Sequence, residues 1–219
     1  MDTNPSIEKY IHRFLEAYAA QETARDVSTG SKRPLYLGLD FDGVLHHAFC
    51  GPRSDHCQKL GAGEINAIQF LAALLLKVQE YGWEVGMPFD RTHALADVLD
   101  ASPFDVRIVI ATSWRLEIAL DDLVSLMPAR LARRVVGILD LDSEFDANGY
   151  SLPGARGQLM ARWMARHAPQ SPWVALDDTP EHWVDHSDRL VETHMAGVDQ
   201  SALAALRTVM ENLARARIA

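Results

Sequence analysis

The sequence of 219 residues predicts an α/β protein in which helices cover both faces of a mainly parallel sheet. Two observations support this class. Short segments that are apolar on both faces alternate along the chain with longer segments of helical periodicity. Polar, oxygen-bearing side chains follow directly after three of the apolar segments, where a parallel sheet would place a binding site. A hydrophobic content of 48% is ordinary for a globular chain and argues against global disorder.

The first 33 residues are expected to form an N-terminal helix and a linker, with the helix packed on the main domain or in a dimer contact. Residues 6–19 carry apolar side chains at helical spacing, which predicts an extra N-terminal amphipathic helix, and the polar residues 21–33 predict a linker. The main domain then runs over 34–219. Within it, the segment 45–90 is a candidate small insertion, polar and irregular over 46–62, with one convincing helix at 63–81.

The remaining elements alternate in type, as a parallel sheet requires. Strands are predicted at 35–39, 107–111, 135–139, 173–176 and 190–193. Helices are predicted at 91–101, 115–126, 155–167 and 199–217, and the polar residues 140–154 predict a loop.

The net charge limits which partners the protein can bind, and the absence of targeting signals indicates its compartment. A net charge of -9 makes the chain a poor general binder of nucleic acid or of anionic membrane. The first residues lack the apolar run of a secretory signal, and the longest apolar run, 70–76, is too short to cross a bilayer. Two cysteines do not make a disulfide framework. We therefore expect a cytoplasmic protein.

Carboxylates and hydroxyls collect at the ends of the predicted strands. The carboxyl ends of parallel strands open into one crevice, so these side chains are expected to meet there. Several carboxylates in one place repel each other unless a cation shares them, and an oxygen-rich site suits Mg²⁺. Three strands end in such residues: Asp40 and Asp42, Thr112 and Ser113, Asp177 and Asp178.

Four segments together resemble the motifs of the haloacid dehalogenase phosphatases. They occur in the family's order between about residues 35 and 200: Asp40-Phe41-Asp42-Gly43-Val44 after an apolar strand, Ile108-Val109-Ile110-Ala111-Thr112-Ser113, Arg156 at the start of a helix, and Val174-Ala175-Leu176-Asp177-Asp178. The runs Thr-Ser-Trp-Arg and Leu-Asp-Asp-Thr-Pro are further similar to a small branch of that superfamily found in bacterial RNA-repair proteins. The resemblance implies a Rossmann-like three-layer sandwich with a small or minimal cap within 45–90.

The resemblance also implies a reaction. Asp40 would attack phosphorus and form an aspartyl-phosphate, and Asp42 would serve as general acid and then as general base. Thr112 would hydrogen-bond a phosphoryl oxygen, and Arg156 would hold it electrostatically. The expected activity is that of a phosphomonoester hydrolase.

The implied cofactor is Mg²⁺. Its ligands would be the carboxylate of Asp40, the backbone carbonyl of Asp42, and Asp178 rather than its neighbour. Asp177 would hold Arg156 or a metal-bound water.

Some assignments remain open at this level. Ser113 competes with Thr112, because the strand end can slip by one residue. An arginine must fill the third motif, because no lysine follows Lys77, and Arg156 has rivals in Arg115, Arg162 and Arg166. His46 and Arg115 are candidate substrate contacts, against the alternative that both are ordinary surface residues.

Other functions are compatible with the same residues. A phosphotransferase or a nucleic-acid-end-processing phosphatase would use the same aspartyl-phosphate, and a non-catalytic binding module could retain the fold. The last is disfavoured because Asp40 and Asp42 are both present. The expected partner is a phosphorylated small molecule or nucleic-acid end, and the helices at 6–19 and 199–217 are candidate homodimer contacts. A dinucleotide-binding dehydrogenase is excluded, since no glycine fingerprint follows the first strand.

Overall fold

The structure is a computed structural model that describes residues 32–52, 54–81, 87–141, 144–147 and 152–216. The predicted helix at 6–19 and the linker that follows it lie outside the described residues, apart from the last two linker positions.

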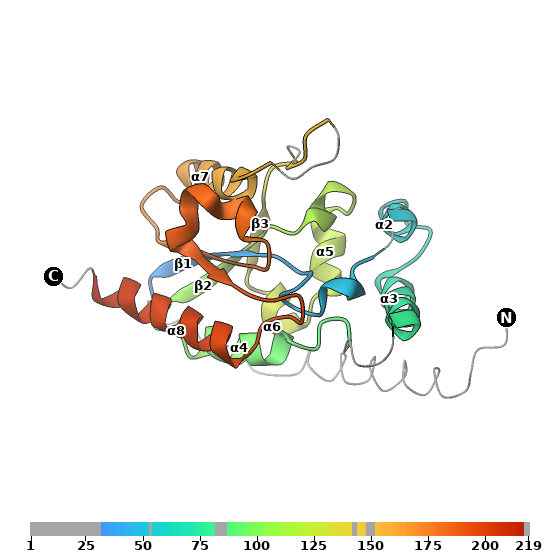
Figure 1. Cartoon of the computed structure of the whole chain (residues 1–219), viewed down its shortest axis with the longest axis horizontal. Helices are drawn as coiled ribbons and strands as arrows, with labels where there is room; N and C mark the ends of the chain where they lie inside the picture. The colour runs from blue at the N-terminus through green and yellow to red at the C-terminus, as the bar shows by residue number, and fades with distance from the viewer. Residues whose placement is uncertain (1–31, 53, 82–86, 142–143, 148–151, 217–219) are drawn as a thin grey trace.

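A five-stranded sheet forms the centre of the molecule, and every strand pair in it is parallel. The strand order is β3-β2-β1-β4-β5, so β1 lies in the middle (Figure 1). This confirms the predicted α/β class. The strands are β1 (Pro34–Leu39), β2 (Asp105–Ile110), β3 (Val135–Ile138), β4 (Trp173–Asp177) and β5 (Leu190–Glu192).

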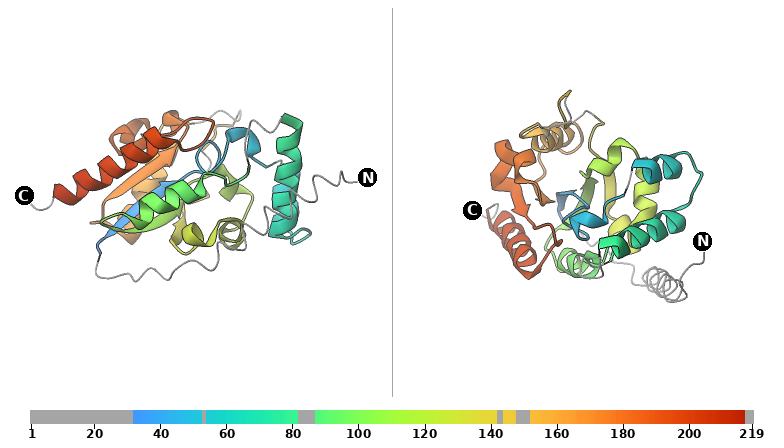
Figure 2. Two further views of the ribbon diagram at one scale, coloured as in Figure 1. Left: turned by 90° about the horizontal axis from the view of Figure 1, so that it is seen from below. Right: turned by 45° about the vertical axis from the view of Figure 1, so that its right-hand side comes forward.

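Successive side chains of a strand point to opposite faces of the sheet, so the interior consists of two cores, one on each face. Leu35, Leu37 and Leu39 point into the larger core, whereas Tyr36 points into the smaller one. The larger core is covered by helices that include α4 (Thr92–Asp100), α5 (Leu120–Leu126), α6 (Ala129–Ala132) and α8 (Gln200–Arg215). The smaller core is covered by α7 (Ala155–His167) and η5 (Pro180–Arg189). Figure 2 shows the helices on either side of the sheet, with α4 beside α8.

The segment between β1 and α4 contains more helix than its sequence predicts. It has a short 3-10 helix, η2 (Ala48–Cys50), followed by α2 (Ser54–Gly61) and α3 (Ala67–Tyr81). The prediction of an irregular segment over 46–62 is therefore wrong for α2. This helix is short and mostly polar, and only Cys57 and Leu60 of it are buried. Its apolar residues are therefore too few to show the spacing that predicts a helix. Both helices lie to one side of the sheet, where α3 contacts α5 (Figure 1).

Other elements also differ from the prediction, including α6, which was not predicted. The helix expected at 115–126 is divided into η4 (Ser113–Leu116) and α5, because residues 117–119 leave helical geometry. The segment η5, two short 3-10 helices joined at a kink where His186 leaves helical geometry, was not predicted, since its buried side chains, His182 and Trp183, are neighbours rather than helically spaced. Among the described residues, no helix is both long and apolar enough to span a membrane.

Candidate active site

Two neighbouring strands bring the two acidic runs of the sequence together. β1 pairs directly with β4, and the backbone N–H of Asp40 donates to the carbonyl of Leu176 at 3.1 Å. The chain places β2 and β3 on one side of β1 and then crosses over to place β4 and β5 on the other, so the strand order reverses between β1 and β4, and this is the switch point where parallel sheets bind ligands. Asp40, Asp177 and Asp178 each offer a carboxylate oxygen within 4.8 Å of the others.

Arg156 lies among these carboxylates. Its Nη1 is 3.0 Å from Oδ2 of Asp40 and 2.6 Å from Oδ2 of Asp177. Its side chain is only 4% exposed, so both ion pairs are shielded from water. The rival arginines Arg162 and Arg166 lie on the exposed side of α7. The geometry therefore favours Arg156 as the cation of the site.

A buried glutamate that sequence analysis did not single out completes this cluster. Both oxygens of Glu144 accept from Arg156, at 2.8 Å from Nε and 3.2 Å from Nη2. One of them also lies 3.4 Å from Nη2 of Arg115. Burial opposes ionisation of Glu144, but the hydrogen bonds and charge of Arg156, and then the charge of Arg115, lower its pKa overall. Glu144 thus fixes the far side of the guanidinium that faces Asp40.

The two aspartates at the end of β4 differ in their hydrogen bonds. Asp177 is fully engaged: Oδ2 accepts from Arg156 and from Nε1 of Trp183 at 2.9 Å, and Oδ1 accepts from the backbone N–H of Thr179 at 2.8 Å. Asp178 accepts at Oδ1 from the Thr179 hydroxyl at 3.1 Å. Oδ2 of Asp178 points toward Gly43. Asp178 is therefore better placed than Asp177 to give an oxygen to a cation.

The turn after β1 can approach Asp178 because it contains glycine. Gly43 has a φ of +65°, and a Cβ at this position would lie 2.0 Å from Oδ2 of Asp178. The carbonyl of Gly43 accepts from the buried hydroxyl of Thr193 at 2.7 Å, which ties the turn to the end of β5.

The charges of the cluster suit a divalent cation. The pKa of Asp40 is raised to about 8, chiefly by burial and then by the charges of Asp177 and Asp42, against the lowering effect of Arg156. Burial, and then the charge of Asp177, also raise the pKa of Asp178. Carboxyls that resist ionisation because they are buried close together are stabilised as anions by a shared cation. Asp40 and Asp178 fit a site for Mg²⁺, an ion that takes one or two carboxylates and oxygen ligands.

Asp42 lies in its own, aromatic environment beside this cluster, close enough for its charge to raise the pKa of Asp40 and of Asp178. Its Oδ2 accepts from Nε1 of Trp114 at 2.7 Å, and its Oδ1 lies 3.1 Å from Nε2 of His46. The side chain of Asp42 is 27% exposed, whereas His46 is completely buried. The two aspartates of the first motif therefore have separate partners.

The structure places the other predicted site residues at different depths. Thr112 is buried at the end of β2, where its hydroxyl accepts from the backbone N–H of Trp114 at 3.4 Å, and Ser113 is half-buried. Arg115, a predicted substrate contact, is buried and donates to the carbonyls of Ala111 and Thr112 at 3.3 and 3.0 Å. A substrate could reach Arg115 only by displacing these bonds. We therefore assign it a role in holding the end of β2.

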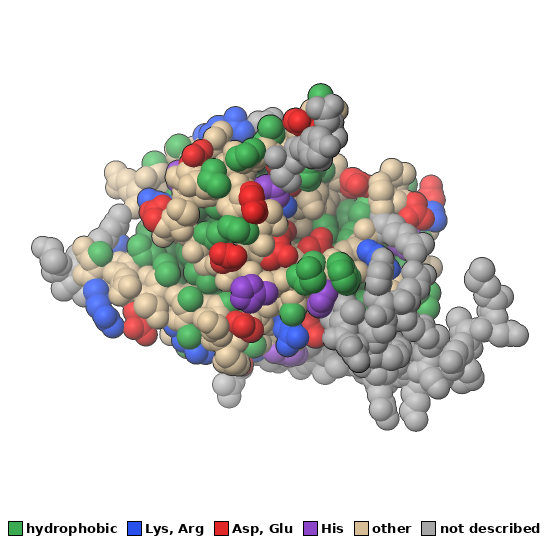
Figure 3. All heavy atoms as spheres, in the orientation of Figure 1, with side chains coloured by type: hydrophobic (Ala, Val, Ile, Leu, Met, Phe, Trp, Pro, Cys, Tyr) green, Lys and Arg blue, Asp and Glu red, His purple; other side chains and the backbone are tan. Residues whose placement is uncertain are grey.

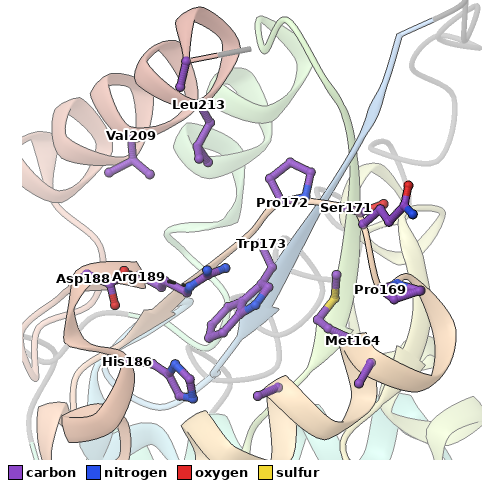
Figure 4. Close-up of a pocket in the computed structure, with 14 residues that line it drawn as sticks. Met164, Pro169, Ser171, Pro172, Trp173, His186, Asp188, Arg189, Val209 and Leu213 are labelled. Carbon is purple, nitrogen blue, oxygen red and sulfur yellow. Dashed lines mark ion pairs between the residues drawn. The ribbon is translucent and has the colours of Figure 1, made fainter.

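A separate pocket of about 640 Å³ lies at the opposite end of β4. It is formed by α7, η5 and α8 around Trp173, and the guanidinium of Arg189 lies 4.7 Å from the Trp173 ring (Figure 4). Trp173 begins the strand that Asp177 ends, so this pocket does not include the carboxylate cluster.

The fold and the site together define a protein of the haloacid dehalogenase superfamily, with a parallel α/β sheet and acidic pairs after β1 and β4. Comparison with known families agrees. The family described as the HAD domain in Swiss Army Knife RNA repair proteins matches residues 36–201, and the chain belongs to this family. No curated protein and no solved structure matched the chain. The superfamily contains hydrolases and phosphatases, which usually use a divalent metal.

Proposed function

We propose that the protein is a Mg²⁺-dependent phosphomonoester hydrolase with Asp40 as nucleophile. The observation that carries this proposal is the cluster of Asp40, Asp178 and Arg156 at the switch point of the sheet. These groups combine a nucleophile, a cation ligand and a fixed positive charge in one place. Bound Mg²⁺ would be held by Asp40 and Asp178 and would supply neutralisation of charge on the phosphoryl group.

In the first step, a carboxylate oxygen of Asp40 attacks phosphorus, and the bond between phosphorus and the leaving oxygen breaks. Asp42 gives its proton to that oxygen, so the product alcohol leaves neutral. In the second step, Asp42 takes a proton from water, the water oxygen attacks phosphorus, and the bond to Asp40 breaks. Inorganic phosphate leaves, and both carboxyls return to their starting states.

In this scheme, Arg156 holds the phosphoryl group in place and stabilises its negative charge. Its guanidinium is held on one side by Glu144, and on the other side it faces the nucleophile at 3.0 Å. A group fixed before substrate arrives need not reorganise as charge develops during the reaction. Thr112 stays a proposed donor to a phosphoryl oxygen, and the choice between it and Ser113 depends on how the substrate enters.

As a narrower proposal, we infer that the substrate is a phosphorylated RNA end. The family is described from RNA repair proteins, and that description is the observation behind this second, narrower proposal. The face seen in Figure 3 carries no basic stripe among its described residues along which a nucleic acid would bind. On the face in Figure 3, Lys and Arg side chains of the described residues lie mostly toward the edges, while Asp, Glu and His occupy the centre. A terminal phosphate that reaches the site alone would be compatible with this distribution.

The test measures release of phosphate from p-nitrophenyl phosphate with Mg²⁺ and with EDTA, in wild type and in Asp40→Asn. Activity is expected to require the metal and to be lost in the variant. Labelled phosphate should be trapped on the wild-type chain by acid quenching and released by hydroxylamine, as an acyl phosphate is. Full turnover by Asp40→Asn, or no trapped label, would contradict the proposal.

Two further measurements separate the alternatives. Partition of the phosphate between water and an added alcohol distinguishes a hydrolase from a phosphotransferase. Oligonucleotides phosphorylated at the 5′ or 3′ end, compared with phosphorylated metabolites, test the RNA-end proposal. A binding module would turn over none of these substrates.

A further inference from the structure

The carboxylate of Asp42 is held by nitrogen donors at both of its oxygens. Nε1 of Trp114 donates to Oδ2 at 2.7 Å, and Nε2 of His46 lies 3.1 Å from Oδ1. Indole nitrogen is only ever a donor, so the first bond has one possible direction. Two donors at opposite oxygens leave the carboxylate little freedom to rotate about its own axis.

The direction of the second bond follows from the other nitrogen of His46. Its Nδ1 accepts from the backbone N–H of Phe89 at 3.4 Å. A ring nitrogen that accepts a hydrogen bond carries no proton, so the neutral ring has its proton on Nε2. His46 therefore donates to Asp42, and the backbone of Phe89 selects the tautomer that allows this.

Packing fixes both donor rings in place. The ring of His46 is 0% exposed and lies 5.0 Å from the ring of Phe89 and 5.6 Å from that of Trp114. Trp114 also packs edge-on against Phe41 at 5.4 Å and against Phe70 of α3 at 5.9 Å. Neither donor can turn without disturbing several buried neighbours.

Gly51 closes the remaining side of the carboxylate. A Cβ on Gly51 would lie 2.8 Å from Oδ1 and 3.0 Å from Oδ2 of Asp42. The backbone of Gly51 has a φ of -51°, which any residue can adopt, so the constraint here is space alone. The backbone thus approaches Asp42 as closely as a residue without a side chain allows.

We propose that His46 and Trp114 are positioning residues for Asp42, and that they aim its carboxyl at the leaving oxygen of the substrate. The inference rests on the proposed function, because it needs Asp42 to be the general acid. It assigns His46 a role that does not involve contact with the substrate, which agrees with its complete burial. The two rings act through Asp42 and take no part in bond making themselves.

The readout that isolates this role is the dependence of kcat/KM on the leaving group. p-Nitrophenolate leaves without needing a proton, whereas an alkoxide does not, so a misplaced general acid slows alkyl phosphates far more than p-nitrophenyl phosphate. In the step that expels the leaving group the Asp42 carboxyl is protonated and uncharged, and loss of a hydrogen bond to an uncharged group corresponds to roughly 2- to 10-fold. His46→Leu and Trp114→Phe should each lower kcat/KM for an alkyl phosphate by about that factor. Their effect on p-nitrophenyl phosphate should be smaller.

Three variants serve as comparisons. His46→Gln keeps an N–H at the place of Nε2 and should recover most of the alkyl phosphate activity. Gly51→Ala leaves both donors but crowds the carboxylate, and should show the same selective loss. His47→Leu replaces the neighbouring histidine, whose ring accepts from the backbone of Phe49, and should leave the leaving-group dependence unchanged.

The outcomes distinguish this inference from the proposed function. If Asp42→Asn shows the selective loss and His46→Leu and Trp114→Phe slow both substrates equally, the positioning role is wrong and the function stands. If Asp42→Asn itself has no selective effect, the general acid is wrongly assigned. Should His46→Leu fail to fold, Trp114→Phe and Gly51→Ala decide the question. Nitrogen NMR of the histidine rings, which needs no substrate, should find the Nε2–H tautomer for His46, and the Nδ1–H tautomer would overturn the proposed hydrogen bond.

Discussion

At the scale of single residues, the site depends on where a side chain is absent as much as on where one is present. Gly43 combines a left-handed backbone with an approach to Asp178 that no Cβ could share. Gly63 has a similar φ of +70°, yet a Cβ there would meet nothing within 4 Å. A substitution at Gly63 would therefore cause backbone strain alone, whereas one at Gly43 would cause the same strain and a collision with Asp178.

Gly43→Ala is expected to abolish binding of Mg²⁺, since the new methyl group would push Asp178 out of place. Left-handed strain should lower the free energy of unfolding by about 1 kcal/mol in this variant and also in Gly63→Ala. Titration calorimetry with Mg²⁺ and urea denaturation test both statements. Equal metal affinities in Gly43→Ala and Gly63→Ala would show that Asp178 is not a ligand.

Glu144 is the residue whose removal should damage the cluster most. Glu144→Gln would leave Arg156 and Arg115 buried with less negative charge around them, and breaking a buried pair costs about 3–5 kcal/mol. The exposed pair of Arg166 and Asp140 offers a control, because Arg166→Gln should cost about 1 kcal/mol at most. Urea denaturation of both variants measures the difference, and similar losses would argue against the buried network.

Part of this site could be predicted from the sequence, because several of its residues lie at the ends of predicted strands. Asp40 and Asp177 could be found because each follows an apolar run, and parallel strands end at one edge. Glu144 could not be found, because it lies in a polar loop among other acidic residues. Only the tertiary position of that loop brings it to Arg156. The inward orientation of His46 was equally hidden, since a histidine in a polar segment has no periodicity to indicate its burial.

At the scale of elements, agreement between prediction and structure follows the strength of the apolar pattern. α7 has the predicted bounds, because Leu159, Met160, Trp163 and Met164 form one buried stripe. η5 was missed because a 3-10 helix with two adjacent buried residues has no such stripe. Its Trp183 nevertheless supplies a donor to Asp177, so an element without a sequence signal still contributes to the site.

Thr193, directly after β5, is joined to the turn after β1 by a side-chain hydrogen bond that one substitution removes. Thr193→Val would leave the buried carbonyl of Gly43 without its hydroxyl donor, which costs about 1–3 kcal/mol. Thr208→Val removes a comparable hydroxyl that donates to Ala204 on the exposed side of α8, and should change stability by less. Thermal unfolding of the two variants makes the comparison. Equal shifts in Tm would mean that the bond to the turn after β1 adds nothing.

At the scale of the whole molecule, the class of fold is easier to predict from the sequence than the order of the strands. Strands that are apolar on both faces require helices on both sides, which the two cores confirm. Nothing in the apolar runs indicates that β1 would lie between β2 and β4. That order follows from long-range pairing, and it decides which acidic pairs become neighbours.

The stability of the whole protein should depend on pH through Asp40. Its pKa of about 8 in the folded protein lies above its ordinary value of 3.8, so the folded state binds this proton more tightly. The resulting stabilisation is complete below about pH 4 and is lost as the pH rises toward 8. Without metal, Tm of the wild type should fall relative to Asp40→Asn between pH 5 and 8. A constant difference between the two would contradict the raised pKa.

Mg²⁺ should oppose this loss. The ion binds the ionised carboxyls, so its stabilising effect should be larger at pH 8 than at pH 5. The same melting experiments with added Mg²⁺ measure it, and Asp40→Asn serves as the control in which the pH dependence of the effect is weakened.

The indole of Trp114 also has a mechanical consequence. One edge of this rigid ring rests on Phe70 in α3, while its nitrogen holds the carboxylate of Asp42. A shift of α3 would therefore also shift the carboxyl that, in the proposed mechanism, delivers the proton. Substitutions on the face of α3 that supports the indole should consequently change the reaction more than substitutions on its exposed face.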